Sequence, residues 1–218
     1  MPLRTLATTA ELAARLSDPN WVVIDCRHDL ADPHAGRAGY RRSHIPGARY
    51  LDAAEDLAAP LTGSNGRHPL PAVDAFAAAL SRAGIDAGKQ VVAYDAQACA
   101  FAARLWWMLR WLGHDAVAVL DGGWSKWLAE GRRVSAETGT PVPARFVAAP
   151  RRSAVDARFV LSSLGQREVM LLDARSPDRF RGENETLDPV GGRIPGAANR
   201  FFKDNLTAEG LFKPPAQL

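Results

Sequence analysis

An internal repeat constrains the fold of this chain more than any other feature of its sequence. The segment 22–27 resembles the segment 171–175, with Asp25 and Asp173 at matching places 148 residues apart. The tetrapeptide I-P-G-A occurs at 45–48 and again at 194–197, 149 residues further on. A Pro-containing stretch at 68–71 is echoed at 212–215, at an offset of 144 residues. Three echoes in the same order, near one offset, indicate two copies of one folded unit.

The first copy alternates strand-like and helix-like segments. The apolar runs at 21–24, 91–94 and 117–120 predict buried parallel strands, because a strand covered on both faces is apolar throughout. Helices are predicted from Thr8 through residue 16 and over 73–83, 101–112 and 124–130, the last three ending at a glycine. Trp106, Trp107 and Trp111 recur at helical spacing and are expected in the core. The fold class is therefore α/β, with a parallel sheet flanked by helices.

The repeat also predicts the domain organisation. We expect a first domain over 1–134, an extended Pro- and Gly-containing linker over 135–152, and a second copy over 153–218. After Pro71 the first copy continues for another 63 residues, whereas three residues follow Pro215. We therefore expect the second copy to lack its later half. A piece this small buries little surface, so it is expected to be loosely held or to dock on the first domain.

Composition excludes several classes of protein. Hydrophobic residues at 47% and charged residues at 23% fit a globular chain, and no apolar run reaches the roughly 18 residues of a membrane span. Two cysteines and no signal-like start predict a cytoplasmic protein without a disulfide framework. The net charge is +3 and the basic residues form no dense cluster, so neither a nucleic acid nor a membrane is an expected partner.

Three motifs carry a family resemblance. They are Y-R-R-S-H-I-P-G-A-R-Y-L at 40–51, V-L-D-G-G-W-S-K-W at 119–127 and D-A-R-S-P-D-R-F-R-G-E at 173–183. The first two resemble the opening and closing motifs of a rhodanese domain, and the third resembles the opening of the second domain in two-domain sulfurtransferases. The resemblance implies two rhodanese-like domains, each a parallel sheet flanked by helices, with the second incomplete.

The resemblance also implies an activity, that of a thiosulfate or 3-mercaptopyruvate sulfurtransferase. A cysteine thiolate at the junction of a strand and a helix takes sulfane sulfur from a small anionic donor as a persulfide and passes it to a thiol, cyanide or a protein. No cofactor and no metal are implied. The nucleophile belongs to the second copy and would fall beyond Leu218, while Asp95 occupies its place in the first copy. The chain is therefore expected to be inactive or nearly so.

Three residues are candidates for a site. By resemblance, Arg179 matches the arginine that reaches the donor anion; the alternative is a surface arginine on the helix beginning at Ser176. His44 either takes part in the site or holds the following turn through backbone hydrogen bonds. Cys99 is either a reactive thiol at a helix start or a small packed residue, and the second interpretation is favoured because buried cysteines are common.

Other interpretations are weaker. Cys26 lies near His28 and His34, but the spacing fits no tetrahedral metal site, and a solvated loop is expected there. A phosphatase of the same fold needs Cys-x5-Arg, and neither cysteine has that arginine. A non-catalytic module that binds anions or a partner protein is the alternative function. The stretch 183–189 lacks the arginine usual in mercaptopyruvate-type members, which weakens that donor without establishing thiosulfate.

Overall fold

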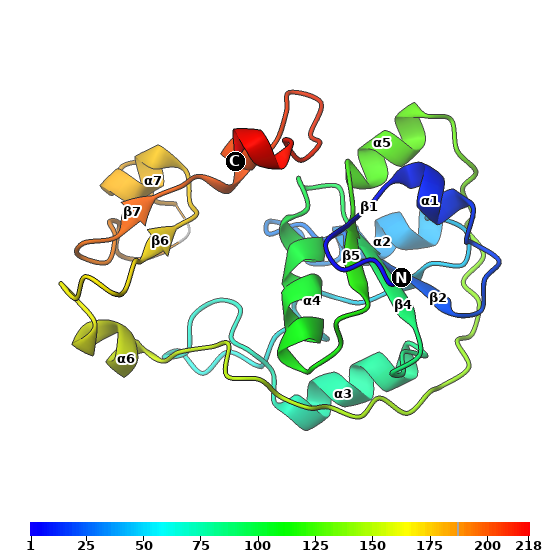
Figure 1. The fold of residues 1–218 in the computed structure, drawn as a ribbon, viewed down its shortest axis with the longest axis horizontal. Coiled ribbons are helices and arrows are strands. Elements are labelled where there is room, and N and C mark those ends of the chain that lie inside the picture. Colours follow the sequence, from blue (N-terminus) through cyan, green and yellow to red (C-terminus); the bar gives the residue numbers. More distant parts are fainter. Residues whose placement is uncertain (187) are drawn as a thin grey trace. The chain divides into compact units, whose positions relative to one another are not determined.

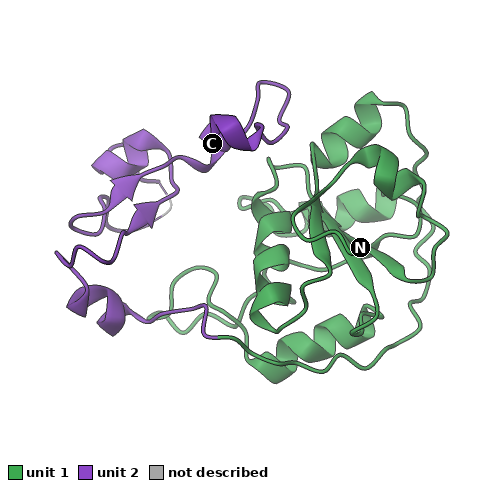
Figure 2. Cartoon of the chain, in the orientation of Figure 1, with its two compact units in different colours: residues 1–151 green, residues 152–218 purple. Residues whose placement is uncertain are grey.

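The protein is described by a computed structural model that covers residues 1–186 and 188–218. The chain divides into two compact units, 1–151 and 152–218 (Figure 2). The division falls within the segment predicted as a linker. Among the described residues, no helix is long and apolar enough to cross a bilayer.

The first unit is built on a parallel sheet of five strands (Figure 1). The strand order is β1-β5-β4-β2-β3, and every pairing is parallel. The three longer strands coincide with the predicted apolar runs, and all residues of β4 are buried. The strands are β1 Leu6–Ala7, β2 Trp21–Asp25, β3 Arg49–Tyr50, β4 Gln90–Tyr94 and β5 Val117–Leu120. The two-residue strands β1 and β3 were not predicted, because two residues carry no periodicity.

Helices flank this sheet, as the fold class predicted (Figure 1). Leu12 of α1 packs with Trp124 and Trp127 of α5 in one cluster with strand residues. Thr8 begins α1 with a reciprocal capping box to Glu11, which satisfies free amide groups of the first turn. The helices of the unit are α1 Thr9–Ala13, α2 Ala35–Arg42, α3 Val73–Arg82, α4 Ala100–Trp111 and α5 Gly123–Ala129.

One expectation for the first unit is wrong, and a second holds for part of its segment. The tryptophans of α4 are half-buried and lie outside the core, because the buried face of the helix is formed by Ala102, Leu105, Met108 and Leu109. The second concerns the segment after β2. Residues 29–34 form an exposed loop, as expected, but Cys26 to His28 before them are buried, and helix α2 follows.

The end of the first unit is an extended segment that packs on the preceding sheet and helices. We call residues 135–151 the strap. Ser135 forms an antiparallel bridge with His44, the amide of Ala144 donates to the carbonyl of Ser81 at 3.0 Å, and Phe146 is buried. The strap is extended, as predicted for the linker, but these contacts tie it to the first unit.

The second unit holds a two-stranded parallel sheet made of β6 and β7. Leu172 and Ile194 are 63% and 48% exposed, whereas their counterparts in the repeat, Ile24 and Ile45, are fully buried. The unit therefore leaves apolar side chains uncovered. Its elements are α6 Ala157–Ser162, β6 Leu172–Asp173, α7 Pro177–Arg181, β7 Ala198–Asn199, and the short 3-10 helices η1 Phe202–Asn205 and η2 Pro215–Gln217.

The local geometry of the repeat is the same in both units. Asp25 pairs with Tyr50 across two parallel strands, and Asp173 pairs with Asn199 in the same way. Each aspartate also binds the arginine two residues later through both carboxylate oxygens. The glycine of each I-P-G-A turn has a positive φ, 77° in one copy and 78° in the other. The sequence echoes thus correspond to equivalent backbone positions.

Candidate functional site

The loop that follows β4 folds around the carboxylate of Asp95. One oxygen accepts the amides of Gln97 at 2.8 Å and Cys99 at 3.0 Å. The other accepts the amides of Phe101 and Ala102, both at 2.8 Å. We call these four amide groups the Asp95 cradle. The aspartate is 1% exposed, so the carboxylate fills the cradle and shields it from water.

Backbone conformation and the start of α4 create the Asp95 cradle. Ala98 and Cys99 both have positive φ, 56° and 65°, which turns successive amides toward one point. The amides of Phe101 and Ala102 belong to the first turn of α4, where they have no partner within the helix and lie at its positive end. Such an arrangement binds an anion with two oxygen atoms. In this unit the anion is a side chain of the protein itself.

The motif at 119–127 holds the loop in place. The amide of Trp124 donates to the carbonyl of Asp95 at 2.8 Å. Gly123 has a φ of 53°, and a side chain there would collide with the same carbonyl oxygen. Gly123 therefore permits a close approach between the start of α5 and the Asp95 loop.

Burial and hydrogen bonding have opposite effects on the Asp95 carboxyl group. Burial raises its pKa, and the four backbone hydrogen bonds oppose that rise, because each favours the charged form. The result is a pKa above the ordinary value for aspartate.

Neither cysteine has the surroundings of an activated thiol. Cys99 is 4% exposed, and its sulfur lies 3.8 Å from the carbonyl of Leu120. Burial, assisted by the charges of Asp95 and Asp121, raises the pKa of the Cys99 thiol to about 12. Cys26 is fully buried, and burial raises its pKa well above the ordinary value. Because the thiolate is the nucleophilic form, both environments oppose reaction.

His44 lies inside the first unit. The side chain is fully buried and stacks on the ring of Tyr40 at 4.2 Å between centroids. Its Nδ1 lies 2.7 Å from the carbonyl of Tyr40, and its Nε2 lies 3.2 Å from the carbonyl of Glu137 in the strap. Both ring nitrogens are therefore occupied by backbone groups, which is the geometry expected if the histidine holds the turn and the strap.

Arg179 lies on α7 and is held by two carboxylates. Its guanidinium contacts Glu185 through two nitrogens at 2.9–3.0 Å and Asp188 at 3.1 Å. Its side chain is 20% exposed. Ser176 is the residue that precedes this helix and Pro177 is its first residue, as predicted. In this arrangement an incoming anion competes with Glu185 and Asp188 for the guanidinium.

A buried ion pair at the end of β2 was missed by the sequence analysis. Arg27 contacts Asp25 at 2.6 Å, and its guanidinium lies over the ring of Trp124 at 4.4 Å. The hydroxyl of Tyr94 donates to the same carboxylate at 2.7 Å. The signal was present in the repeat, since Asp173 and Arg175 recur at the same spacing. This network joins the ends of β2 and β4 to the start of α5.

The described side chains around Cys26 do not form a metal site. In the described part of the chain, no three His, Cys, Asp or Glu side chains come together in a group that could hold a metal ion. Cys26 and His28 are buried, while His34 and the intervening acidic residues are exposed.

Comparison with known proteins gives one consistent family. Residues 8–130 match the model of the rhodanese-like domain. The chain is 47% identical to a Pseudomonas aeruginosa protein named "Probable 3-mercaptopyruvate sulfurtransferase", over 98% of this chain and 76% of that protein. It is 34% identical to the thiosulfate sulfurtransferase of Bos taurus, over 99% of this chain and 75% of that protein. The chain thus spans about three quarters of the length of these relatives.

A solved structure resembles the chain over nearly its whole length. The crystal structure of SseA from Escherichia coli, a 3-mercaptopyruvate sulfotransferase, aligns with a TM-score of 0.85 at 30% identity. The alignment covers 99% of this chain and 81% of that one.

Proposed function

The chain belongs to the rhodanese family of sulfurtransferases, and from that premise we propose that it serves the transfer of sulfane sulfur from a small anionic donor to a thiophilic acceptor. The donor is thiosulfate or 3-mercaptopyruvate, and the acceptor is a thiol, cyanide or a protein. In such a transfer a cysteine thiolate attacks the sulfane sulfur, a sulfur–sulfur bond forms, and the donor's bond to that sulfur breaks with its electron pair leaving on the donor. The acceptor then removes the sulfur and restores the thiolate.

The Asp95 cradle is the observation that carries this proposal. An anion-binding loop at the junction of a parallel strand and a helix is the setting that lowers the pKa of a thiol. In the first unit a carboxylate occupies that loop, so the unit has the architecture of the site without its nucleophile. We assign the first unit, 1–134, to a rhodanese-like domain that supports the fold and performs no sulfur transfer.

The second unit contributes a donor-binding residue in this proposal. We assign 153–218 to the first half of a second rhodanese-like domain, with 135–152 between the two. Arg179 there presents a planar guanidinium that matches a sulfonate or carboxylate group. Its contacts with Glu185 and Asp188 keep the side chain ordered until the donor replaces them. His44 is retained as a residue that orders the turn and the strap of the first unit through backbone contacts.

An assay of sulfur transfer tests the proposal. The 218-residue chain is incubated with thiosulfate and cyanide, and separately with 3-mercaptopyruvate and a thiol. We expect no turnover above a heat-denatured sample, because both of its thiols are buried and protonated. The variant Cys99→Ser is the matched control and should behave as the native chain. Turnover comparable with that of a complete family member, abolished by Cys99→Ser, would contradict the assignment of the nucleophile.

The second candidate is a non-catalytic module that binds anions or a partner protein. The burial of both cysteines favours it for the chain as it stands. The two functions differ in one observable, since the module predicts thiosulfate binding without any persulfide. A persulfide-specific label that marks the chain after exposure to thiosulfate would count against the module.

We place the protein in the cytoplasm in this proposal and assign it neither a nucleic acid nor a membrane as a partner. Two cysteines that remain free support a reducing compartment. The scattered arginines support the absence of a nucleic-acid surface.

A further inference from the structure

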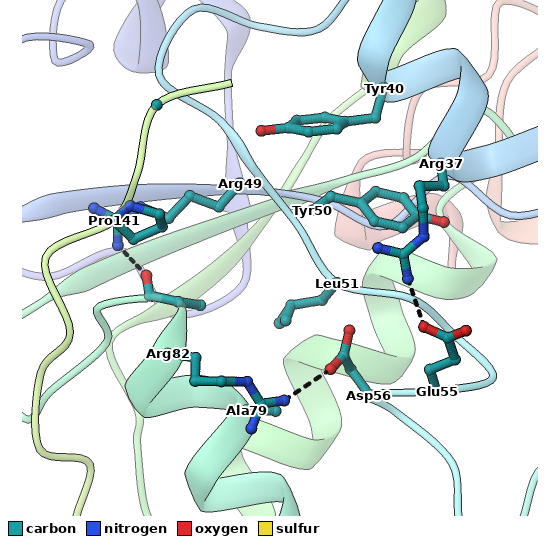
Figure 3. A pocket seen from close by; sticks show the side chains of 12 residues that line it. Arg37, Tyr40, Arg49, Tyr50, Leu51, Glu55, Asp56, Ala79, Arg82 and Pro141 are labelled. Atoms are coloured by element: carbon teal, nitrogen blue, oxygen red, sulfur yellow. Dashed lines mark hydrogen bonds and ion pairs between the residues drawn. The ribbon is translucent and has the colours of Figure 1, made fainter. Parts of the chain in front are cut away.

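Arg49 of β3 lies between two hollows on the surface of the first unit. One has a volume of about 380 Å³ and is bounded by α2, β3 and α3 (Figure 3). The other, of about 570 Å³, adjoins it on the side of Trp21 and Lys89. Arg49, Gly139 and Pro141 line both hollows, so the strap forms a wall that they share.

The guanidinium of Arg49 has a surplus of hydrogen-bond donors. One nitrogen, Nη1, donates to the carbonyl of Ala83 at the end of α3. Among the described residues, no carboxylate lies within ion-pair distance of this guanidinium. Burial lowers the pKa of Arg49 and thus disfavours its positive charge, which is a cost that an anion would offset.

The other two arginines of the first hollow are already neutralised. Arg37 pairs with Glu55 at 2.6 Å, and Arg82 pairs with Asp56 at 3.2 Å (Figure 3). Among the described residues that line this hollow, Arg49 therefore carries the one unpaired positive charge. The two carboxylates would repel a ligand with further negative charge, so the arrangement favours a ligand with a single anionic group.

The other residues that line the hollow suit the apolar part of an organic ligand. Tyr40 and Tyr50 stack with their ring centroids 5.5 Å apart, and Leu51 and Ala79 line the hollow near them. Figure 3 shows Arg49 on one side of this space and the Arg82–Asp56 pair on another. A volume of about 380 Å³ is near the lower end of the range for small-molecule sites.

We propose that this hollow binds a small organic monocarboxylate, anchored by its carboxylate on the guanidinium of Arg49. The carboxylate takes the donors that Arg49 does not give to Ala83, in the planar, bidentate geometry that guanidinium groups favour. The body of the ligand lies against the tyrosine and leucine side chains. The lining of the hollow includes neither the residues of the Asp95 cradle nor Arg179, and the proposal goes beyond the proposed sulfur transfer.

A titration with benzoate tests this proposal. The reporters are the backbone amides of residues 49–51 and 139 and the Nε–H of Arg49 in nitrogen-15 NMR spectra of the full chain. One ion pair and a small apolar contact predict a dissociation constant on the order of 1 mM. Arg49→Gln should weaken binding at least about 10-fold, because it removes the charge and the bidentate contact. Arg41→Gln is the matched control, since Arg41 is exposed on α2 and outside both hollows, and it should bind as the native chain does.

A second variant keeps the test valid if the first one fails to fold. Gly139 is exposed, has no atom within 4 Å of an added Cβ, and lines both hollows. Gly139→Tyr should therefore fold normally and reduce benzoate binding by occupying the space. Absence of saturable shifts at these reporters, or unchanged affinity in Gly139→Tyr, would overturn the proposal. Sulfate binding as tight as benzoate would overturn its organic part, because an inorganic dianion cannot use the apolar walls.

Discussion

Replacement of Asp95 by alanine is the perturbation for which the structure predicts the clearest effect. The change removes the acceptor of four backbone hydrogen bonds. Two of the donors, the amides of Cys99 and Ala102, belong to buried residues that water reaches poorly. A buried donor left without a partner costs about 1–3 kcal/mol, so the two together cost roughly 2–6 kcal/mol of the free energy of unfolding.

Thermal unfolding followed by circular dichroism measures this loss. A change of 1 kcal/mol shifts the melting temperature by about 2–4 °C in a domain of roughly 150 residues, so we expect Asp95→Ala to melt at least about 4 °C below the native chain. Asp74→Ala is the matched control, because Asp74 lies in the first turn of α3 away from the cradle, and it should shift the transition far less.

The emptied cradle should accept an anion from solution. Thiosulfate or sulfate is therefore expected to raise the melting temperature of Asp95→Ala more than that of the native protein, since a ligand stabilises the state that binds it. The reasoning is refuted if Asp95→Ala melts within 1 °C of the native chain, or if both respond equally to the anion. Either result would mean that the four amides do not depend on the carboxylate.

Three further predictions concern the two units and their titratable groups. Limited proteolysis should cut beyond residue 150 first, because the second unit has a two-stranded sheet and exposed Leu172; equal resistance of both units would contradict this. Alkylation with iodoacetamide at pH 8 should leave Cys26 and Cys99 unmodified until denaturant is added, and rapid labelling of the folded chain would contradict the burial of these thiols. Burial lowers the pKa of His68 and His114, so both are neutral when folded and bind protons more readily when unfolded. The free energy of unfolding should therefore be largest above about pH 6.5, the pKa of histidine in the unfolded chain, and should fall as the pH drops below that value. A melting temperature unchanged between pH 7.5 and 5.5 would refute this.

The sequence predicted the central strands and the long helices of the first unit because their patterns are continuous. Residues 91–94 and 117–120 are unbroken apolar runs, and they form β4 and β5. Helix α2 was missed because Ala35–Arg42 contains two glycines and has no capping side chain, both of which weaken a local helix signal. Gly36 is needed there for a tertiary reason: a side chain would collide with the carbonyl of Arg27.

The sequence indicated where Asp95 lies along the chain relative to the strands, but not which contacts its side chain makes. The alignment of the motifs placed Asp95 at the loop after β4, and the structure shows that loop folded around it. The sequence could not show that the carboxylate accepts four amides, because this depends on the positive φ of Ala98 and Cys99. The sequence did not identify Glu185 and Asp188 as the partners of Arg179, because these contacts depend on the tertiary structure around α7. The burial of His44 likewise depends on the strap, about 90 residues away in sequence.

The central claim is that the first unit carries a filled anion cradle and that neither thiol of the chain accepts sulfur. Intact-mass spectrometry of the native chain, after incubation with thiosulfate and separately with 3-mercaptopyruvate, tests it most directly. The account predicts an unchanged mass with both donors. A stable gain of one sulfur atom, mapped to Cys26 or Cys99 by fragmentation and removed by cyanide, would contradict it.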